Sequence, residues 1–148
     1  MTRAPKVVVD ASVAVKWYVP ENGSREAVAL LGSSARLLAP DLLVAEFGNT
    51  LWKKIRRGEL KGDEGNAIVR AFLAGPPVVL YASTPLLQPA WEMALGFRRT
   101  IYDALYLALA VAQDCPFVTA DAALARAIRD TALREFVMPL ISWTSSQT

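Results

Sequence analysis

Short apolar runs alternate with longer amphipathic segments along the whole chain. The run Lys6–Asp10 is three valines between a lysine and an acid, which predicts a fully buried strand. Further strands are expected at 36–39, 78–81 and 117–119, and a last short one within 136–143. Each run has the length and the β-branched or apolar character of a short strand, and the segments between them are long enough for helices.

The segments between the predicted strands have helical periodicity. After Pro40-Asp41, apolar residues recur every fourth position at Leu43, Phe47, Leu51 and Ile55, which predicts an amphipathic helix ending in basic residues before Gly58. The other expected helices are 24–31, 62–73, 84–97, 103–113 and 121–129, with a short helical or irregular stretch at 12–18. The helix at 103–113 is apolar on nearly all sides, so we expect it to be buried.

Strands that alternate with helices predict an α/β fold with a mainly parallel sheet. The chain has 148 residues, which suits one domain with a sizeable core and is short for two. We expect a single domain over residues 1–144, with a central sheet of about five short strands flanked by helices, and a flexible tail at 145–148. In such sheets, ligands bind beyond the carboxyl ends of the strands.

Two residue counts limit the possible chemistry. The chain has no histidine and one cysteine. This excludes Ser-His and Cys-His catalysis, histidine-ligated metal sites and an internal disulfide. The net charge of +2 permits a nucleic-acid partner without requiring one. We expect a soluble cytoplasmic protein, because the longest apolar run, 104–112, is about half the length that spans a bilayer.

Acidic residues stand where the predicted strands end. Asp10 ends the first strand, and Asp121 comes two residues after the fourth. Asp103 opens the apolar helix that precedes the fourth strand, and Glu46 lies on the amphipathic helix after the second. Because the carboxyl ends of parallel strands meet at one edge of a sheet, these four acids are candidates for one site.

Each of the four acids also has a purely structural interpretation. Asp10 and Asp121 suit helix N-caps, Asp103 suits a capping box opened by Thr100, and Glu46 suits a solvated surface position. For any single acid, the structural interpretation is the more common one. Taken together, three of the acids lie in almost wholly apolar local sequence, where carboxylates are rarely buried unless they are paired or bind an ion.

Converging carboxylates require a counter-charge. Two unit charges about 5 Å apart repel by roughly 3 kcal/mol at an effective dielectric of 20. Either the pKa values of the acids rise or a cation binds. Oxygen ligands select hard ions such as Mg²⁺ or Mn²⁺, and such ions activate water and stabilise charge on a phosphoryl group. The pattern therefore favours a metal-dependent phosphodiesterase.

Four segments carry these acids in a fixed order. They are VVVDASVAVKWYVPE from Val7, PDLLVAEFGNTLWKKIRRGEL from Pro40, TIYDALYLALA from Thr100 and FVTADAAL from Phe117. Together the segments resemble the PIN-domain ribonucleases of the VapC toxin type, over nearly the whole chain. The resemblance implies a PIN-like, Rossmann-like domain that cleaves RNA phosphodiester bonds with Mg²⁺ or Mn²⁺ and a metal-activated water.

The resemblance also implies roles and partners. It implies one cluster of catalytic, metal-binding carboxylates: Asp10, Glu46, Asp103 and Asp121. Three further residues match polar positions near the metal in this family: Ser12, Asn49 and Thr119. The family further implies a homodimer and a cognate VapB-like antitoxin that neutralises the nuclease.

Basic residues near the acids are candidates for contacts with RNA phosphates. They are Lys16, Lys53, Arg98 and Arg99. Lys53 lies at a helix end where the helix dipole also favours cations. Arg98 and Arg99, just before the helix of Asp103, are better placed for phosphate contact, and their alternative is a solvated turn. Lys16 could reach the site or extend its apolar stem along the surface.

Two other functional classes remain open. A catalytically weak or inactive PIN-like module would bind RNA or a partner without turnover, although the four intact acids argue against it. A Mg²⁺-binding receiver domain would have adjacent acids after its first strand, whereas this chain has Asp10-Ala-Ser. Nucleotide-binding folds are disfavoured, because neither G-x-G-x-x-G nor G-x-x-x-x-G-K-[ST] occurs.

Overall fold

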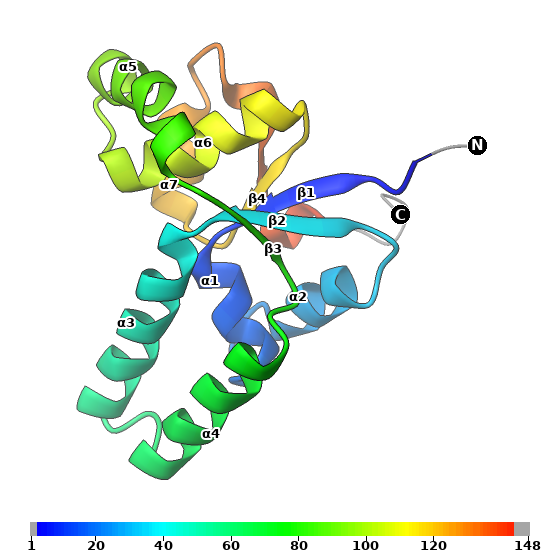
Figure 1. Ribbon diagram of the computed structural model, residues 1–148, viewed down its shortest axis with the longest axis vertical. Coiled ribbons are helices and arrows are strands. Elements are labelled where there is room, and N and C mark those ends of the chain that lie inside the picture. The colour runs from blue at the N-terminus through cyan, green and yellow to red at the C-terminus, as the bar shows by residue number, and fades with distance from the viewer. Residues whose placement is uncertain (1–2, 144–148) are drawn as a thin grey trace.

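A parallel sheet of five strands, in the order β3-β2-β1-β4-β5, forms the centre of the molecule (Figure 1). The computed structural model describes residues 3–143, and the predicted tail at 145–148 lies outside this range. The strands are β1 (Lys6–Val9), β2 (Arg36–Pro40), β3 (Val79–Tyr81), β4 (Phe117–Thr119) and β5 (Val137–Pro139). All five lie within or overlap the runs predicted from the hydrophobic pattern.

Strand β1 lies in the middle of the sheet and has a neighbour on each side. Val8 aligns with Leu38 of β2 and with Phe117 of β4. Its valines are buried, as predicted for a strand covered on both faces. The chain builds the sheet outward from β1 in both directions, so the strand order reverses between β1 and β4. At such a reversal the connections diverge and leave a crevice at the carboxyl ends of the strands.

Seven α-helices flank the sheet within the described residues. They are α1 (Ala11–Ala14), α2 (Ser24–Leu31), α3 (Leu42–Arg56), α4 (Gly62–Ala74), α5 (Leu87–Phe97), α6 (Ile101–Gln113) and α7 (Ala122–Ile128). Figure 1 shows α5, α6 and α7 on one side of the sheet and α1, α2 and α3 on the other, with α3 and α4 extending away from it as a pair. None of the helices in residues 3–143 has the length and apolarity needed to cross a bilayer.

Two packing contacts position the helices that carry the candidate site. Helix α6 is buried along Ala104–Ala110, which confirms the prediction made from its apolar sequence. Helices α3 and α4 are joined by stacking of Phe47 on Phe72, with ring centroids 4.4 Å apart, and Tyr18 meets both rings edge-on. The apolar stripe of α3 therefore faces the core, and the opposite flank of the helix is left for polar residues.

Two predicted elements are present, each combined with a 3-10 turn. The helix expected at 84–97 begins as a 3-10 turn at Thr84–Leu86 and becomes α-helical only at Leu87. Pro85 lies in that first turn, where its missing N–H costs no hydrogen bond. The last strand covers only Val137–Pro139 and continues as a 3-10 turn at Leu140–Ser142.

Candidate active site

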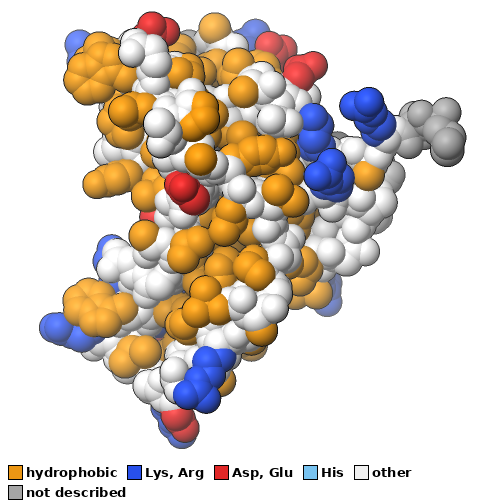
Figure 2. Space-filling model, viewed as in Figure 1, with side chains coloured by type: hydrophobic (Ala, Val, Ile, Leu, Met, Phe, Trp, Pro, Cys, Tyr) orange, Lys and Arg blue, Asp and Glu red, His pale blue; other side chains and the backbone are white. Residues whose placement is uncertain are grey.

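The four candidate acids line one cavity of about 220 Å³ at the carboxyl ends of β1 and β4. Its walls come from the segments after β1 and β4 and from helices α3 and α6: Asp10, Ala11, Ser12, Glu46, Thr50, Asp103, Tyr106 and Asp121. Figure 2 shows the outline of the molecule hollowed on the side between α3 and the α5–α6 pair. The cavity therefore lies in the crevice that the strand order predicts.

Asp10 is the buried acid of this cavity, with 9% of its surface exposed. Thr119 Oγ1 donates to Asp10 Oδ2 over 2.6 Å, and Ser12 Oγ donates to Oδ1. The backbone N–H of Val13 also donates to Oδ1, over 3.3 Å, which makes Asp10 the N-cap of α1. The capping interpretation and the site interpretation of Asp10 are thus both consistent with its position.

The two hydroxyl groups that hold Asp10 are themselves held by the backbone after β4. The N–H of Ala120 donates to Ser12 Oγ over 3.1 Å, and the N–H of Asp121 donates to Thr119 Oγ1 over 3.0 Å. Each hydroxyl accepts from the backbone and donates to the carboxylate. This network ties the end of β1 to the end of β4 and orients Asp10.

Burial raises the pKa of Asp10 to about 6. The hydroxyls of Ser12 and Thr119 and the N–H of Val13 lower this pKa, because they stabilise the charged form, and the nearby charge of Glu46 raises it. Loss of solvation exceeds the effect of all three donors, so a proton or a cation at Asp10 would relieve a real electrostatic cost.

Glu46 projects from α3 and accepts a hydrogen bond from the phenol of Tyr106, over 2.6 Å. Burial raises the pKa of Glu46, the Tyr106 hydroxyl lowers it, and the charge of Asp103 raises it. The Tyr106 ring is buried and stacks on Phe117 of β4, with centroids 5.4 Å apart and planes 6° apart. The hydrophobic pattern does not single out Tyr106, although its position three residues after Asp103 puts both on one face of α6.

Asp103 lies in the first turn of α6 and is paired with a cation. Arg99 donates to Asp103 Oδ2 from Nη2 over 2.8 Å and from Nε over 3.2 Å. Thr100 is the N-cap and accepts from the Asp103 N–H, so half of the predicted capping box is present. Arg98 ends α5 in the left-handed conformation, with φ of 54°. This reversal directs the chain into α6 and leaves Arg99 beside the acids.

Asp121 is both an N-cap and a wall of the acid cavity. Its Oδ1 accepts from the N–H of Leu124 over 3.1 Å, which caps α7. Unlike Asp10, Asp121 is exposed to solvent. The four acids therefore range from buried to exposed, from the floor of the cavity to its mouth.

Asn49 lies outside the acid cavity. It lines an adjoining cavity of about 380 Å³ together with Leu42, Ala45, Glu46 and Tyr102. Thr50, the residue after Asn49, lines the acid cavity instead, and its hydroxyl donates to the backbone oxygen of Glu46 over 2.9 Å.

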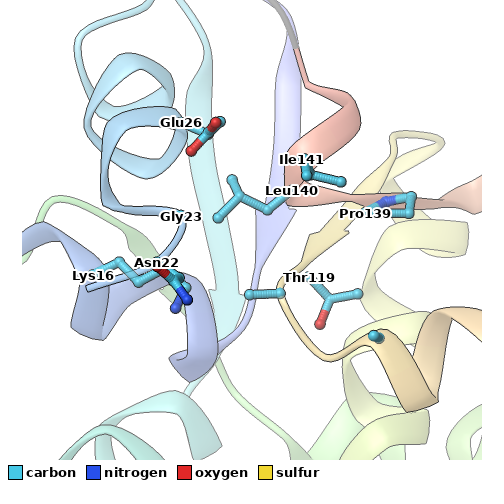
Figure 3. A pocket seen from close by; sticks show the side chains of 10 residues that line it. Lys16, Asn22, Gly23, Glu26, Thr119, Pro139, Leu140 and Ile141 are labelled. Carbon is cyan, nitrogen blue, oxygen red and sulfur yellow. The ribbon is translucent and has the colours of Figure 1, made fainter.

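None of the four candidate basic residues, Lys16, Lys53, Arg98 and Arg99, lines the acid cavity. Lys16 lines another cavity of about 340 Å³, to which Thr119 also contributes (Figure 3), and pairs with Glu21 over 3.1 Å. Lys53 is exposed on α3. Arg99 is in direct contact with one of the four acids.

The donors around the cavity suit a hard cation by their chemistry and their common location. They are carboxylate and hydroxyl oxygens, the ligands that Mg²⁺ and Mn²⁺ prefer. As the side chains stand, no three acids or thiols within residues 3–143 are grouped closely enough to hold a metal ion. In this arrangement the Asp103 carboxylate is paired with Arg99.

Comparison with known proteins places the sequence in a family. Residues 7–129 match the PIN domain model. The chain is 37% identical to Ribonuclease VapC3 of Pyrobaculum aerophilum over 123 residues, which cover 81% of this chain and 92% of that protein. It is 33% identical to Ribonuclease VapC1 of Mycobacterium tuberculosis over 124 residues, which cover 81% of this chain and 89% of the relative.

Solved structures share the fold at lower sequence identity. The crystal structure of PAE2754 from Pyrobaculum aerophilum superposes with a TM-score of 0.69 at 21% identity, covering 93% of this chain and 85% of that one. The structure of Mycobacterium tuberculosis VapC20, a toxin that cleaves the sarcin-ricin loop, gives a TM-score of 0.62 at 17% identity, covering 82% and 94%. From the family match and the related sequences together, the chain belongs to the PIN-domain family, among the VapC ribonucleases.

Proposed function

We propose that this chain is a metal-dependent endoribonuclease and the toxin of a VapBC-type pair. The observation that carries the proposal is the convergence of Asp10, Glu46, Asp103 and Asp121 on one cavity in a chain of the VapC family. The proposed partners are an RNA substrate, a VapB-like antitoxin and a second copy of the chain. An RNA substrate implies that the protein acts in the cytoplasm.

The four carboxylates are the proposed holders of Mg²⁺ or Mn²⁺. Such an ion, when bound, lowers the pKa of water and stabilises negative charge on the phosphoryl group. Asp10 is the most firmly oriented of the four, because two hydroxyls and one N–H fix its oxygens. Ser12 and Thr119 therefore support the site by holding Asp10, in keeping with the role that the sequence resemblance implies.

Glu46 is the proposed proton acceptor for the attacking water. Burial raises the pKa of Glu46, which makes its carboxylate a stronger base, and Tyr106 orients one of its oxygens. Arg99 is the proposed contact for the scissile phosphate: when Asp103 turns toward a cation, the guanidinium becomes available to the anionic substrate. Arg98, Lys53 and Lys16 are proposed to contact phosphates farther along the RNA.

A cleavage assay with matched variants tests the proposed function. Labelled RNA is incubated with the protein and Mg²⁺ or Mn²⁺, then with EDTA. We expect cleavage by the unmodified chain and a loss of about 100-fold or more for Asp10→Asn or Asp121→Asn, the scale on which removal of one catalytic group acts. Asp63→Asn, an acid in the first turn of α4, is the control and keeps full activity. Cleavage that survives both EDTA and the Asp10 substitution contradicts the proposal.

One observation favours a second candidate, a PIN-like module that binds RNA without turnover. Within the described residues no three acids are grouped tightly enough to hold an ion, and Asp103 is paired with Arg99. The same assay separates the two candidates: retention of RNA without cleavage at any tested Mn²⁺ concentration supports the binding module.

A further inference from the structure

A second cavity adjoins the acid cavity and shares Glu46 with it. Helix α3 contributes Leu42, Ala45, Glu46 and Asn49 to this cavity, and Tyr102 of α6 forms its other side. Its volume is about 380 Å³. A group bound in it would lie directly beside the candidate catalytic carboxylates.

Tyr102 is the exposed aromatic residue of this cavity, with 59% of its surface accessible. It immediately precedes Asp103 in the first turn of α6, whereas the helix is buried from Ala104 to Ala110. The ring therefore contributes little to the core and presents apolar surface to solvent next to the acids. Exposed aromatic rings of this kind are the surfaces on which unpaired bases stack in single-stranded nucleic acid complexes.

The remaining lining residues indicate what kind of group the cavity accepts. Leu42 and Ala45 provide apolar walls, and Asn49, which is exposed on α3, provides an amide that both donates and accepts hydrogen bonds. Among the described residues, Glu46 is the one carboxylic acid that lines the cavity, and no lysine or arginine lines it. A phosphate would meet no lysine or arginine on these walls, whereas a flat, neutral ring with hydrogen-bonding edges suits them.

We propose that this cavity is a nucleobase subsite, in which a base next to the scissile phosphate stacks on Tyr102 and meets Asn49 at its edge. The inference rests on the proposed ribonuclease function and specifies its substrate as unpaired RNA at this position, since a base inside a duplex presents neither face. Asn49 thereby acquires a role in recognition, beside the acid cavity and not within it.

Binding measurements test the subsite without requiring turnover. Asp121→Asn protein is titrated with a short fluorescent single-stranded RNA and with a set of the same RNA in which each nucleotide in turn is made abasic. We expect the abasic change at one position to weaken binding by about 5- to 100-fold, the range for loss of one aromatic–base stack. The double variant Asp121→Asn, Tyr102→Ala is expected to bind the intact RNA more weakly by the same factor. In this double variant, making the sensitive nucleotide abasic causes no further loss of affinity.

Three further variants sharpen the test. Tyr102→Phe keeps the ring and binds within about twofold of the parent, while Trp91→Ala, which removes an aromatic residue with 52% exposure on α5, leaves the abasic pattern unchanged. RNAs that carry each of the four bases at the position sensitive to the abasic change are expected to differ less in affinity for Asn49→Ala than for the parent. The subsite is contradicted if Tyr102→Ala binds the intact RNA as tightly as the parent does. It is also contradicted if Tyr102→Ala weakens binding of the intact and the abasic RNA by the same factor.

Two controls distinguish failure of the subsite from other outcomes. If Tyr102→Ala changes the oligomeric mass measured by light scattering without changing the abasic pattern, the ring belongs to a protein interface and the subsite is wrong. Cleavage by the unmodified chain is assayed in parallel. Cleavage together with insensitivity to Tyr102→Ala overturns only the subsite, whereas base-dependent binding without any cleavage supports the subsite and overturns the nuclease.

Discussion

Asp10 combines burial with three hydrogen-bond donors, and this balance makes the stability of the protein depend on pH. Its pKa is raised from 3.8 to about 6, so the folded state holds the proton more tightly than the unfolded chain. The resulting stabilisation is fully present below the unfolded pKa and is lost as the pH rises through about 6. In Asp10→Asn this titration is absent.

We therefore expect the stability of the unmodified chain relative to Asp10→Asn to fall by roughly 2 kcal/mol between about pH 4 and pH 7. Urea unfolding of both metal-free proteins across this range measures the difference. Two stability curves that run parallel would show that the folded and unfolded pKa values of Asp10 are the same.

Tyr106→Phe is expected to destabilise the site while preserving its packing. The phenylalanine ring can still stack on Phe117, but Glu46 loses its donor at 2.6 Å. We expect a loss of about 1–3 kcal/mol in the free energy of unfolding and a further rise in the pKa of Glu46. Tyr18→Phe, whose ring packs on Phe47 and Phe72, is the matched control. Equal stability of the Tyr106 variant and the parent would contradict the role of this hydrogen bond.

The sequence allowed the acids and the two hydroxyl partners of Asp10, Ser12 and Thr119, to be proposed, but not Tyr106. Strand ends and apolar context identified Asp10, Asp103 and Asp121, because both signals are local. The contact between Glu46 and Tyr106 spans 60 residues, and no local pattern encodes it. Asp41, which directly precedes α3, makes no side-chain capping bond and instead accepts a hydrogen bond from the Ser83 hydroxyl, 42 residues away in sequence.

At the level of elements, the turn between α5 and α6 decides what neutralises Asp103. Arg99 and Asp103 are about three-quarters buried as side chains, at 26% and 24% exposure, and are four residues apart. Because such a pair still meets solvent, its contribution to stability is expected to be below about 1 kcal/mol. Its larger effect is to compete with a cation for the Asp103 carboxylate.

Arg99→Gln is therefore expected to tighten Mn²⁺ binding by about 2- to 5-fold, which corresponds to the strength of one such ion pair. Calorimetric titration of the metal-free protein measures this change directly. Arg98→Gln, which removes the neighbouring charge without an ion pair to Asp103, is the control and changes the affinity less. Unchanged or weaker binding in Arg99→Gln would show that the ion pair does not compete with the metal.

Element prediction succeeded where one pattern dominated. The stripe of Leu43, Phe47 and Leu51 on α3 and the apolar run of α6 each specified a helix, and both helices are present. Boundaries were less exact: β3 begins at Val79, and α6 begins at Ile101, before the expected start at Asp103. Such boundaries depend on tertiary hydrogen bonds and on caps such as Thr100, which hydrophobic periodicity does not report.

For the whole molecule, metal binding is expected to raise thermal stability. An ion that binds only the folded state at 100 times its Kd adds about 2.7 kcal/mol, which for a chain of this size raises Tm by about 5–10 °C. Differential scanning calorimetry with Mn²⁺ measures the shift, and EDTA reverses it. Asp121→Asn is expected to lose most of the shift and Asp63→Asn to keep it. An equal shift in all three proteins would place the ion elsewhere.

The hydrogen bond between Thr119 and Asp10 joins residues 109 positions apart. A ribosome adds roughly 5–20 residues per second, so about 5–20 s pass between the synthesis of Asp10 and that of Thr119 in β4. Until β4 has left the ribosome, β1 lacks one of its two neighbours, and the carboxylates have no common cavity. A growing chain is therefore expected to lack nuclease activity, which arises only near the end of its own synthesis.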